Sequence, residues 1–431
     1  MTEPRARSTI GPVAALSIGV GGMIGAGIFS ILGVVASVSG SALPLSFAVG
    51  GIVAALAAYS YVALGKTFPS VGGPVTFLVR GYGAGVVSGS LNLFMYFSYI
   101  ITIALYAMGF AAYAVTFIDL PPKVWAVGVV VAFTAINFLG ARSMGRAESA
   151  IVIVKVGILL VFIAAALLAL PEGGMTRLSP ASWPGPLAIF TGAGLLFVGY
   201  ERFGLITNAA ANMANPKREL PRAIYGSVAI VIIIYVLVAS GVVTNVPLSE
   251  LKGLGDSALA VAAKPSLGQA GFRLVAIAAL LSTASAVNAT LFGSTNIAYQ
   301  IAKNGDLPPA FDRRLWGRDV EGLFITSGLV LVFVLVFPLR AVASMGSAGF
   351  LLLYAAVSIG HVRIRTQTGA KLWPLVASIA TCLGLFAVVF RNMVTTVPTS
   401  AIALGVTLAA SFLIETLYRR RTGRTFREIL S

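Results

Sequence analysis

A glycine-rich interruption lies inside the first long apolar stretch of this chain. Residues 19–29 read Gly-Val-Gly-Gly-Met-Ile-Gly-Ala-Gly-Ile-Phe, and five of these eleven positions are glycine. Each glycine inside a helix costs up to about 1 kcal/mol relative to alanine, so the run favours a broken helix. In a bilayer, irregular backbone occurs only where it is buried in protein or lines a cavity. A membrane helix broken near its midpoint is typical of the substrate site of a secondary transporter.

The composition indicates a membrane protein along the whole chain. Hydrophobic residues make up 58% of it and charged residues 10%, and the mean hydropathy is +0.95. This is far more apolar than a soluble domain. Stretches of about 20 apolar residues, the length that spans a bilayer as a helix, recur throughout. The sequence predicts an all-α fold of twelve transmembrane helices, over residues 11–34, 42–65, 85–117, 124–139, 149–170, 186–213, 223–245, 272–302, 323–337, 341–361, 372–390 and 398–417.

The positions of the basic residues predict the orientation of these helices. With the N-terminus inside, 21 of the 30 Lys and Arg residues fall on the inner side and 7 on the outer side. By the positive-inside rule, both termini are then cytoplasmic. The net charge of +16 is therefore mainly a topology signal and gives no indication of nucleic-acid binding. The basic end of the chain is expected to meet anionic lipid headgroups, and the protein is expected in the plasma membrane as a multi-pass protein.

The sixth apolar stretch repeats the anomaly of the first. Residues 191–204 read Thr-Gly-Ala-Gly-Leu-Leu-Phe-Val-Gly-Tyr-Glu-Arg-Phe-Gly, with four glycines and two charges at membrane depth. Interrupted helices at corresponding positions, 1 and 6, predict two inverted repeats of five helices each. The alternative is that both runs are glycine-rich faces for close helix packing. The expected organisation is an N-terminal tail (1–10), a transport core (11–361, with repeats at about 11–170 and 186–361), two peripheral helices (372–418) and a basic tail (419–431).

Four motifs, in order along the chain, resemble those of amino acid–polyamine–organocation transporters. These are Gly-Met-Ile-Gly-Ala-Gly-Ile-Phe at 22–29, Phe-Pro-Ser-Val-Gly-Gly-Pro at 68–74, Asn-Pro-Lys-Arg-Glu-Leu-Pro-Arg-Ala-Ile at 215–224, and Ser-Ala-Val-Asn-Ala at 285–289 followed by Ala-Tyr at 298–299 and Asn-Gly-Asp-Leu-Pro at 304–308. The resemblance runs from about residue 11 to 308 and is weaker beyond. It implies the LeuT-type fold, which bacterial and archaeal amino acid permeases share.

The break in the first helix suits a zwitterionic substrate. Free N–H groups and the positive dipole end of its second half attract a carboxylate, and Gly25, Ala26 and Gly27 are placed to donate. The first halves of the two broken helices end in exposed carbonyls that suit an ammonium group, those of Met23, Ile24, Gly199 and Tyr200. The resemblance implies the same arrangement. Selectivity for a small α-amino acid then needs no charged side chain.

Lys155 lies within the fifth apolar stretch, in Val-Ile-Val-Lys-Val-Gly-Ile-Leu-Leu. An ionisable residue inside a membrane helix indicates a functional site. The resemblance implies that such a lysine takes the place of sodium in proton-coupled relatives, and that its ammonium bridges the first helix near Gly22 and the eighth near Ser285. The alternative is a lysine that extends its ammonium to the nearby membrane surface.

Arg202 is the main departure from the resembling family, because most relatives carry glycine at this place beside the substrate side chain. Its forked donors suit an acidic substrate side chain. Alternatively it pairs with Glu201 or another group and narrows the site. In the third helix, a polar face is shared by Asn92, Tyr96, Tyr99 and Tyr106, and Tyr96 and Tyr99 are the predicted pocket walls. The alternative is that these polar residues only form hydrogen bonds between helices.

The expected function is secondary transport of amino acids or related amines by alternating access, in symport with protons. The alternatives are an exchanger of the same substrates, or a membrane sensor that binds an amino acid without transporting it. A membrane enzyme is disfavoured, and the single cysteine (Cys382) and histidine (His361) argue against a metal site or a disulfide. We expect no cofactor. The expected partners are the small-molecule substrate, protons and the lipid bilayer.

Overall fold

The computed structural model describes residues 11–70, 72–139, 144–251, 255–303 and 321–422. Within these ranges the chain is helical, with no strand. The expected tails, 1–10 and the end of 419–431, fall wholly or mostly outside them, as does the motif at 304–308. The helices are α1 (Pro12–Met23), α2 (Ala26–Ser39), α3 (Leu43–Thr67), α4 (Pro74–Tyr82), α5 (Val86–Ala114), α6 (Pro122–Leu139), α7 (Met144–Leu168), α8 (Pro186–Leu195), α9 (Pro216–Asn245), α10 (Leu248–Leu251), α11 (Ala258–Lys303), α12 (Glu321–Val336), α13 (Leu339–Arg363), α14 (Arg365–Thr368), α15 (Leu372–Thr396) and α16 (Pro398–Thr422).

The helices confirm a multi-pass membrane protein. Over the described ranges, ten segments are long and apolar enough to cross a bilayer, and two shorter apolar helices, Val13–Met23 and Gly322–Val336, accompany them. One of the ten segments, Gly27–Thr67, joins α2 to α3. Each of the twelve apolar stretches read from the sequence lies on helices of the structure. The count of twelve crossings stays a prediction.

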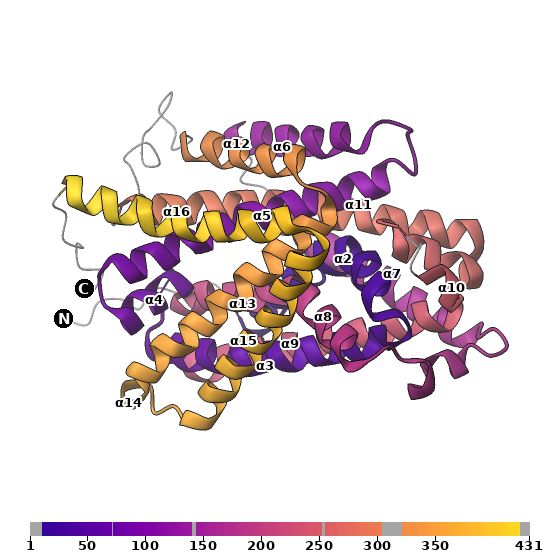
Figure 1. Ribbon diagram of the computed structural model, residues 1–431, viewed down its shortest axis with the longest axis horizontal. Coiled ribbons are helices and arrows are strands. Elements are labelled where there is room, and N and C mark those ends of the chain that lie inside the picture. The colour runs from indigo at the N-terminus through magenta and orange to yellow at the C-terminus, as the bar shows by residue number, and fades with distance from the viewer. Residues whose placement is uncertain (1–10, 71, 140–143, 252–254, 304–320, 423–431) are drawn as a thin grey trace.

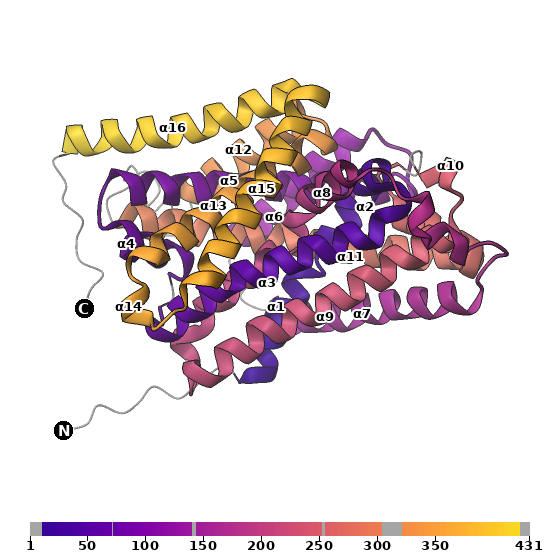
Figure 2. The same ribbon diagram turned by 60° about the horizontal axis from the view of Figure 1, so that its bottom comes forward.

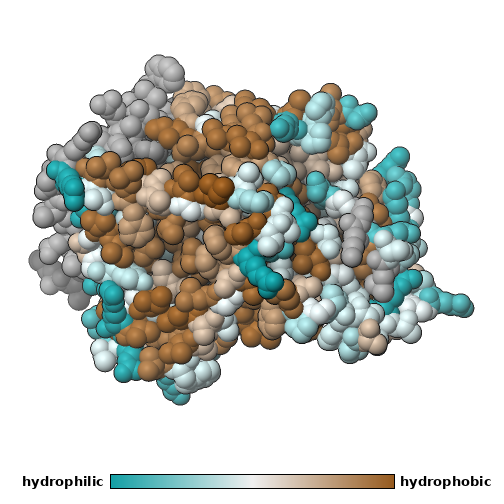
Figure 3. Space-filling view, viewed as in Figure 1, coloured by the Kyte–Doolittle hydropathy of each residue, from teal (hydrophilic) through white to brown (hydrophobic). Residues whose placement is uncertain are grey.

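The long helices form one bundle, and the short helices α4, α10 and α14 lie at its ends. In Figure 1, α4 and α14 are at the left end and α10 is at the right end. Apolar side chains cover much of the face between these ends, while hydrophilic ones gather toward the ends and in a patch right of centre (Figure 3). In Figure 2, α7 and α9 run side by side along the lower edge, where they also contact each other.

The first broken helix is interrupted over a shorter length than its glycine run suggested. α1 ends at Met23 and α2 begins at Ala26, so only Ile24 and Gly25 lie between them. The ψ of Gly25 is −125°, far from helical. Gly19, Gly21 and Gly22 stay within α1. There they serve close packing, since a Cβ on Gly21 would lie 2.5 Å from Val152 on α7.

The sixth apolar stretch is interrupted over a greater length. α8 ends at Leu195, and two 3₁₀ segments follow, η4 (Phe197–Gly199) and η5 (Glu201–Asn212). Runs of 3₁₀ helix longer than about four residues are uncommon and often mark a hinge or a sequence under strain. The structure therefore shows both irregular segments that the sequence indicated.

Helices that are far apart in the chain pack closely against each other. α3 packs on α9, α5 packs on α11, and α6 packs on α12. The two interrupted segments also meet, because α1 contacts η5 and α2 contacts α8. The residues at these contacts form one continuous apolar core. The helix breaks are thus held at the centre of the bundle.

Candidate functional site

The break between α1 and α2 exposes backbone groups of both kinds. The last carbonyls of α1 have no partner within that helix, nor do the first N–H groups of α2, among them those of Ala26 and Gly27. Gly25 and Gly27 are both buried. Buried backbone groups require partners, so the side chains that reach the break determine what can bind there.

Three side chains from three other helices donate to the carbonyls of this break. They come from α7, α9 and α11, which pack around α1 and α2. The bonds run from Lys155 Nζ to the Gly21 carbonyl (2.6 Å), from Tyr235 Oη to Met23 (2.5 Å), and from Ser282 Oγ to Ile24 (3.2 Å) and Gly25 (3.0 Å). The carbonyl side of the break is therefore satisfied by donors of the protein itself.

The second break lies directly against the first. A Cβ on Gly27 would be 2.7 Å from the Cα of Gly199 and 3.2 Å from Tyr235 Oη. Only a glycine allows two backbones to approach this closely. Tyr235 Oη also lies 3.3 Å from the carbonyl of Gly199, while Tyr200 donates from its hydroxyl to the carbonyl of Phe47 at 3.0 Å. The backbone groups assigned to the substrate from the sequence are thus brought together.

Arg202 is buried between four helical segments. Its Nε lies 3.5 Å from Glu201 Oε1, its Nη2 donates to the carbonyl of Ala286 on α11 at 3.4 Å, and its guanidinium lies 5.1 Å from the ring centre of Tyr106 on α5. On the fourth side a Cβ added to Gly22 would be 3.3 Å from the arginine side chain. The ion pair with Glu201 agrees with the second of the two interpretations of this arginine.

The two tyrosines predicted as pocket walls point in different directions. Tyr99 packs edge-on against Phe350 of α13, with ring centres 5.2 Å apart. Tyr96 is buried too, but its hydroxyl is 2.8 Å from Thr326 Oγ1 on α12, which lies on the far side of α5 from α3 and α9. Tyr99 is therefore linked through Phe350 and Tyr354 to Phe197 of the second break. Tyr96 joins α5 to α12.

Lys155 reaches one of the two places expected for it. It is 3% exposed and binds the carbonyl of Gly21, which is adjacent to the predicted contact at Gly22. On α11 the hydroxyl that contacts the break is that of Ser282, and Ser285 lies about one turn further along, half-buried. The Lys155 side chain is buried and its ammonium binds the last turn of α1, so this lysine extends toward the bundle interior.

Sequence reasoning missed Tyr235 and Ser282. Tyr235 interrupts an apolar run, Val-Ile-Ile-Ile-Tyr-Val, in the middle of α9. A lone polar residue in a membrane helix turns toward a partner, and this was the available signal. Ser282 carries less signal, because it is one of several hydroxyl residues on α11.

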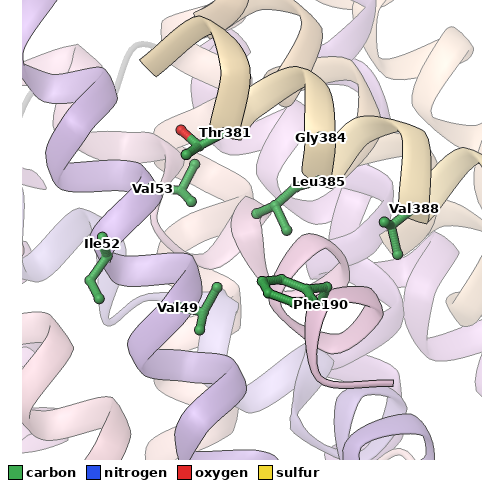
Figure 4. Close-up of a pocket in the computed structure, with 8 residues that line it drawn as sticks. All are labelled: Val49, Ile52, Val53, Phe190, Thr381, Gly384, Leu385 and Val388. Carbon is green, nitrogen blue, oxygen red and sulfur yellow. The ribbon is translucent and has the colours of Figure 1, made fainter. Parts of the chain in front are cut away.

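Two cavities lie away from the breaks. One, of about 460 Å³, is apolar and lies between α3, α8 and α15 (Figure 4), lined by Val49, Ile52, Val53, Phe190, Thr381, Gly384, Leu385 and Val388. The other, of about 850 Å³, includes Lys123 and Asp256 in its lining at the ends of α5, α12 and the starts of α6 and α13. Neither lining includes a residue of the breaks, and the break residues are buried.

Within the described ranges, no group of three His, Cys, Asp or Glu side chains is placed to hold a metal ion.

The sequence is similar to known proteins over nearly its whole length. Residues 10–417 match the family model described as amino acid permease. An uncharacterised protein of Methanocaldococcus jannaschii is 41% identical over 418 residues, covering 96% of this chain and 95% of that protein.

Two further relatives carry names that describe transport. The inner membrane transport protein YbaT of Escherichia coli is 35% identical, over 83% of this chain and 84% of its own length. The branched-chain amino acid permease BcaP of Bacillus subtilis is 24% identical, over 85% of this chain and 82% of its own length.

Proposed function

This chain belongs to the amino acid permease family, and from that premise we propose that it carries neutral, branched-chain amino acids across the plasma membrane in symport with protons. It is a membrane transporter of amino acids, not an enzyme. The observation that carries the proposed substrate site is the meeting of the two broken helices at Gly27 and Gly199. Lys155 is held on the carbonyl end of the first break.

The proposed architecture is a core of two inverted five-helix repeats, within 11–361, flanked by two peripheral helices within 372–418. The packing supports it. When the apolar stretches are numbered along the chain, α3, α5 and α6 are the second, third and fourth, and α9, α11 and α12 are the seventh, eighth and ninth. Each helix of the first set packs on the helix five places later. Both termini are proposed to be cytoplasmic because of the distribution of basic residues.

The proposed substrate is neutral because the charges beside the breaks compensate each other. The guanidinium of Arg202 lies 3.5 Å from the carboxylate of Glu201, and both side chains are buried. An acidic or basic substrate side chain would add an uncompensated charge, which is costly in a buried site. The name of the BcaP relative points to branched-chain amino acids among the neutral ones. Their carboxylate is proposed to bind the N–H groups of Ala26 and Gly27, and that of Gly25 once it releases the Gly22 carbonyl, to which it donates at 3.3 Å.

Proton coupling is proposed for Lys155. Its ammonium links α7 to the end of α1 through a 2.6 Å hydrogen bond, so the two helices are joined by a group that exchanges a proton. Loss of the proton would weaken this bond and change how α1 packs on α7. A ligand drives a transition only if it interacts differently with the two states, and we propose that a proton on Lys155 does so.

Substrate-dependent thermal stabilisation of the purified protein tests the proposed substrate class. A ligand that binds the native state raises its stability in proportion to the logarithm of its concentration over Kd. We expect leucine, isoleucine and valine to raise the Tm, and glutamate, aspartate, lysine and arginine to leave it unchanged. Stabilisation by the charged amino acids alone would contradict the proposal.

Arg202→Gly is expected to lower the thermal stability and the binding of all neutral amino acids alike. Removing one partner of a buried ion pair leaves the other charge uncompensated, at a cost of about 3–5 kcal/mol. The double variant Glu201→Gln with Arg202→Gly should recover most of the loss. Arg391→Gly, at an exposed helical position, controls for the glycine itself. If Arg202→Gly instead allowed neutral binding and removed binding of glutamate, the arginine would be a substrate contact.

A further inference from the structure

One tyrosine hydroxyl lies between the two helix breaks. Tyr235 is completely buried, and its Oη is 2.5 Å from the carbonyl oxygen of Met23 and 3.3 Å from that of Gly199. Its ring is fixed by aromatic neighbours, Phe47 at 5.4 Å and Tyr200 at 5.2 Å between ring centres. The hydroxyl thus lies between two carbonyl oxygens, one from each broken helix.

These are two of the four carbonyls proposed to receive the substrate ammonium. A third, that of Ile24, accepts from Ser282 Oγ at 3.2 Å. A primary ammonium has three N–H donors and no acceptor, and it needs oxygens at about 2.8–3.0 Å. In this structure, hydroxyl donors of the protein occupy those oxygens. A substrate ammonium that bridges the Met23 and Gly199 carbonyls would compete with the Tyr235 hydroxyl for the position between these two oxygens.

The proposed carboxylate position is adjacent to the same hydroxyl. Gly27 is in the first turn of α2, where N–H groups have no acceptor within the helix. A Cβ on Gly27 would be 3.2 Å from Tyr235 Oη. The carboxylate and ammonium of an α-amino acid are attached to one carbon, so the two subsites must be neighbours, and here they are.

We propose that the Tyr235 hydroxyl substitutes for the substrate ammonium in the empty transporter and leaves the Met23 and Gly199 carbonyls when an α-amino acid binds. This inference rests on the proposed function. Buried carbonyls without a donor are costly. The hydroxyl therefore stabilises the empty closed site, which a symporter must pass through to return and bind again. It also weakens binding of an α-amino acid, because its hydrogen bonds compete with those of the ammonium.

The test is Tyr235→Phe, which keeps the ring and removes the hydroxyl. We expect the Kd of leucine to fall roughly threefold to tenfold, the effect of one hydrogen bond that no longer has to be broken. The Kd of 4-methyl-2-oxopentanoate, which has the carboxylate and side chain of leucine but no ammonium, should not fall. Net uptake, which requires the empty transporter to return, should slow more than leucine–leucine exchange, which does not.

Tyr113→Phe is the matched control. Tyr113 is also buried, and its hydroxyl also donates to a carbonyl of the first broken helix, that of Phe29, at 3.0 Å. Phe29 lies further along α2, beyond its first turn. This variant should leave the Kd of leucine unchanged and should reduce net uptake and exchange to the same extent, if at all.

The outcomes separate this proposal from the proposed function. If the wild-type protein binds no α-amino acid, the proposed substrate class is wrong. The role proposed for Tyr235 is wrong if the wild type binds leucine and Tyr235→Phe binds it no more tightly. It is also wrong if the substitution lowers the Kd of leucine and the Kd of the oxo acid equally. Should Tyr235→Phe not fold, 3-fluorotyrosine at position 235 replaces it. Its ¹⁹F resonance should shift with leucine and much less with the oxo acid, and equal shifts would overturn the proposal.

Discussion

Gly27→Ala is expected to reduce amino acid uptake by at least about a hundredfold. The added Cβ would lie 2.7 Å from the Cα of Gly199, a distance that side-chain movement does not relieve because the contact is with backbone. The two breaks would have to separate by about 1 Å, and misplacement on that scale in a binding site costs on the order of a hundredfold. Initial rates of leucine uptake in proteoliposomes measure the effect.

Gly128→Ala provides the control for this variant. Gly128 is also within a membrane helix, α6, but a Cβ there would meet no atom within 4 Å. We expect it to transport as the wild type does and to be slightly more stable, because alanine favours a helix. Gly27→Ala should still insert into the membrane and elute as a folded protein. Normal uptake by a folded Gly27→Ala variant would show that substrate transport does not depend on the contact between the breaks.

Lys155→Ala is expected to remove the response of uptake to a proton gradient. The variant loses the group proposed to carry the proton, and it leaves the Gly21 carbonyl without the hydrogen bond that Lys155 donates at 2.6 Å. The ratio of leucine uptake with an inward proton gradient to uptake without it should fall to about one. Without Lys155, no bound proton distinguishes the conformational states of the transporter. Leucine–leucine exchange, which needs no net proton movement, should persist.

Lys264→Ala is the matched control for charge and residue type. Lys264 is exposed near the start of α11, with its ammonium 4.6 Å from the ring centre of Phe272. Removing it should leave the gradient response intact. An unaltered gradient response in Lys155→Ala, or stimulation of the wild type by sodium in place of protons, would refute the coupling role of Lys155.

The helical class and the two interruptions were predictable because both are encoded locally. Apolar stretches of spanning length and clusters of glycine are properties of short segments, and the breaks at Ile24–Gly25 and after Leu195 fall within the segments that the sequence singled out. The extent of each break was less predictable. The sequence does not distinguish Gly25 from Gly19, Gly21 and Gly22, because all four belong to the same glycine-rich run. The last three stay helical, and other segments of the chain pack against them.

The partners of the breaks were not predictable, because they are set by tertiary packing. Tyr235 is 212 residues from Met23 in the chain, and Ser282 is 257 residues from Gly25. For Arg202, the sequence left two interpretations open, because adjacent residues face each other only if the helix is irregular there. The 3₁₀ backbone of η5 supplies that irregularity, and the guanidinium lies 3.5 Å from Glu201.

Accumulation of leucine in proteoliposomes tests the central claim, that this protein is a proton-driven transporter of neutral branched-chain amino acids. The measurement compares purified wild-type protein under an inward proton gradient, under an inward sodium gradient and under neither. The account predicts that the internal leucine concentration rises above the external one only under the proton gradient. Absence of accumulation under the proton gradient, with accumulation under sodium or with equilibration alone, would contradict it.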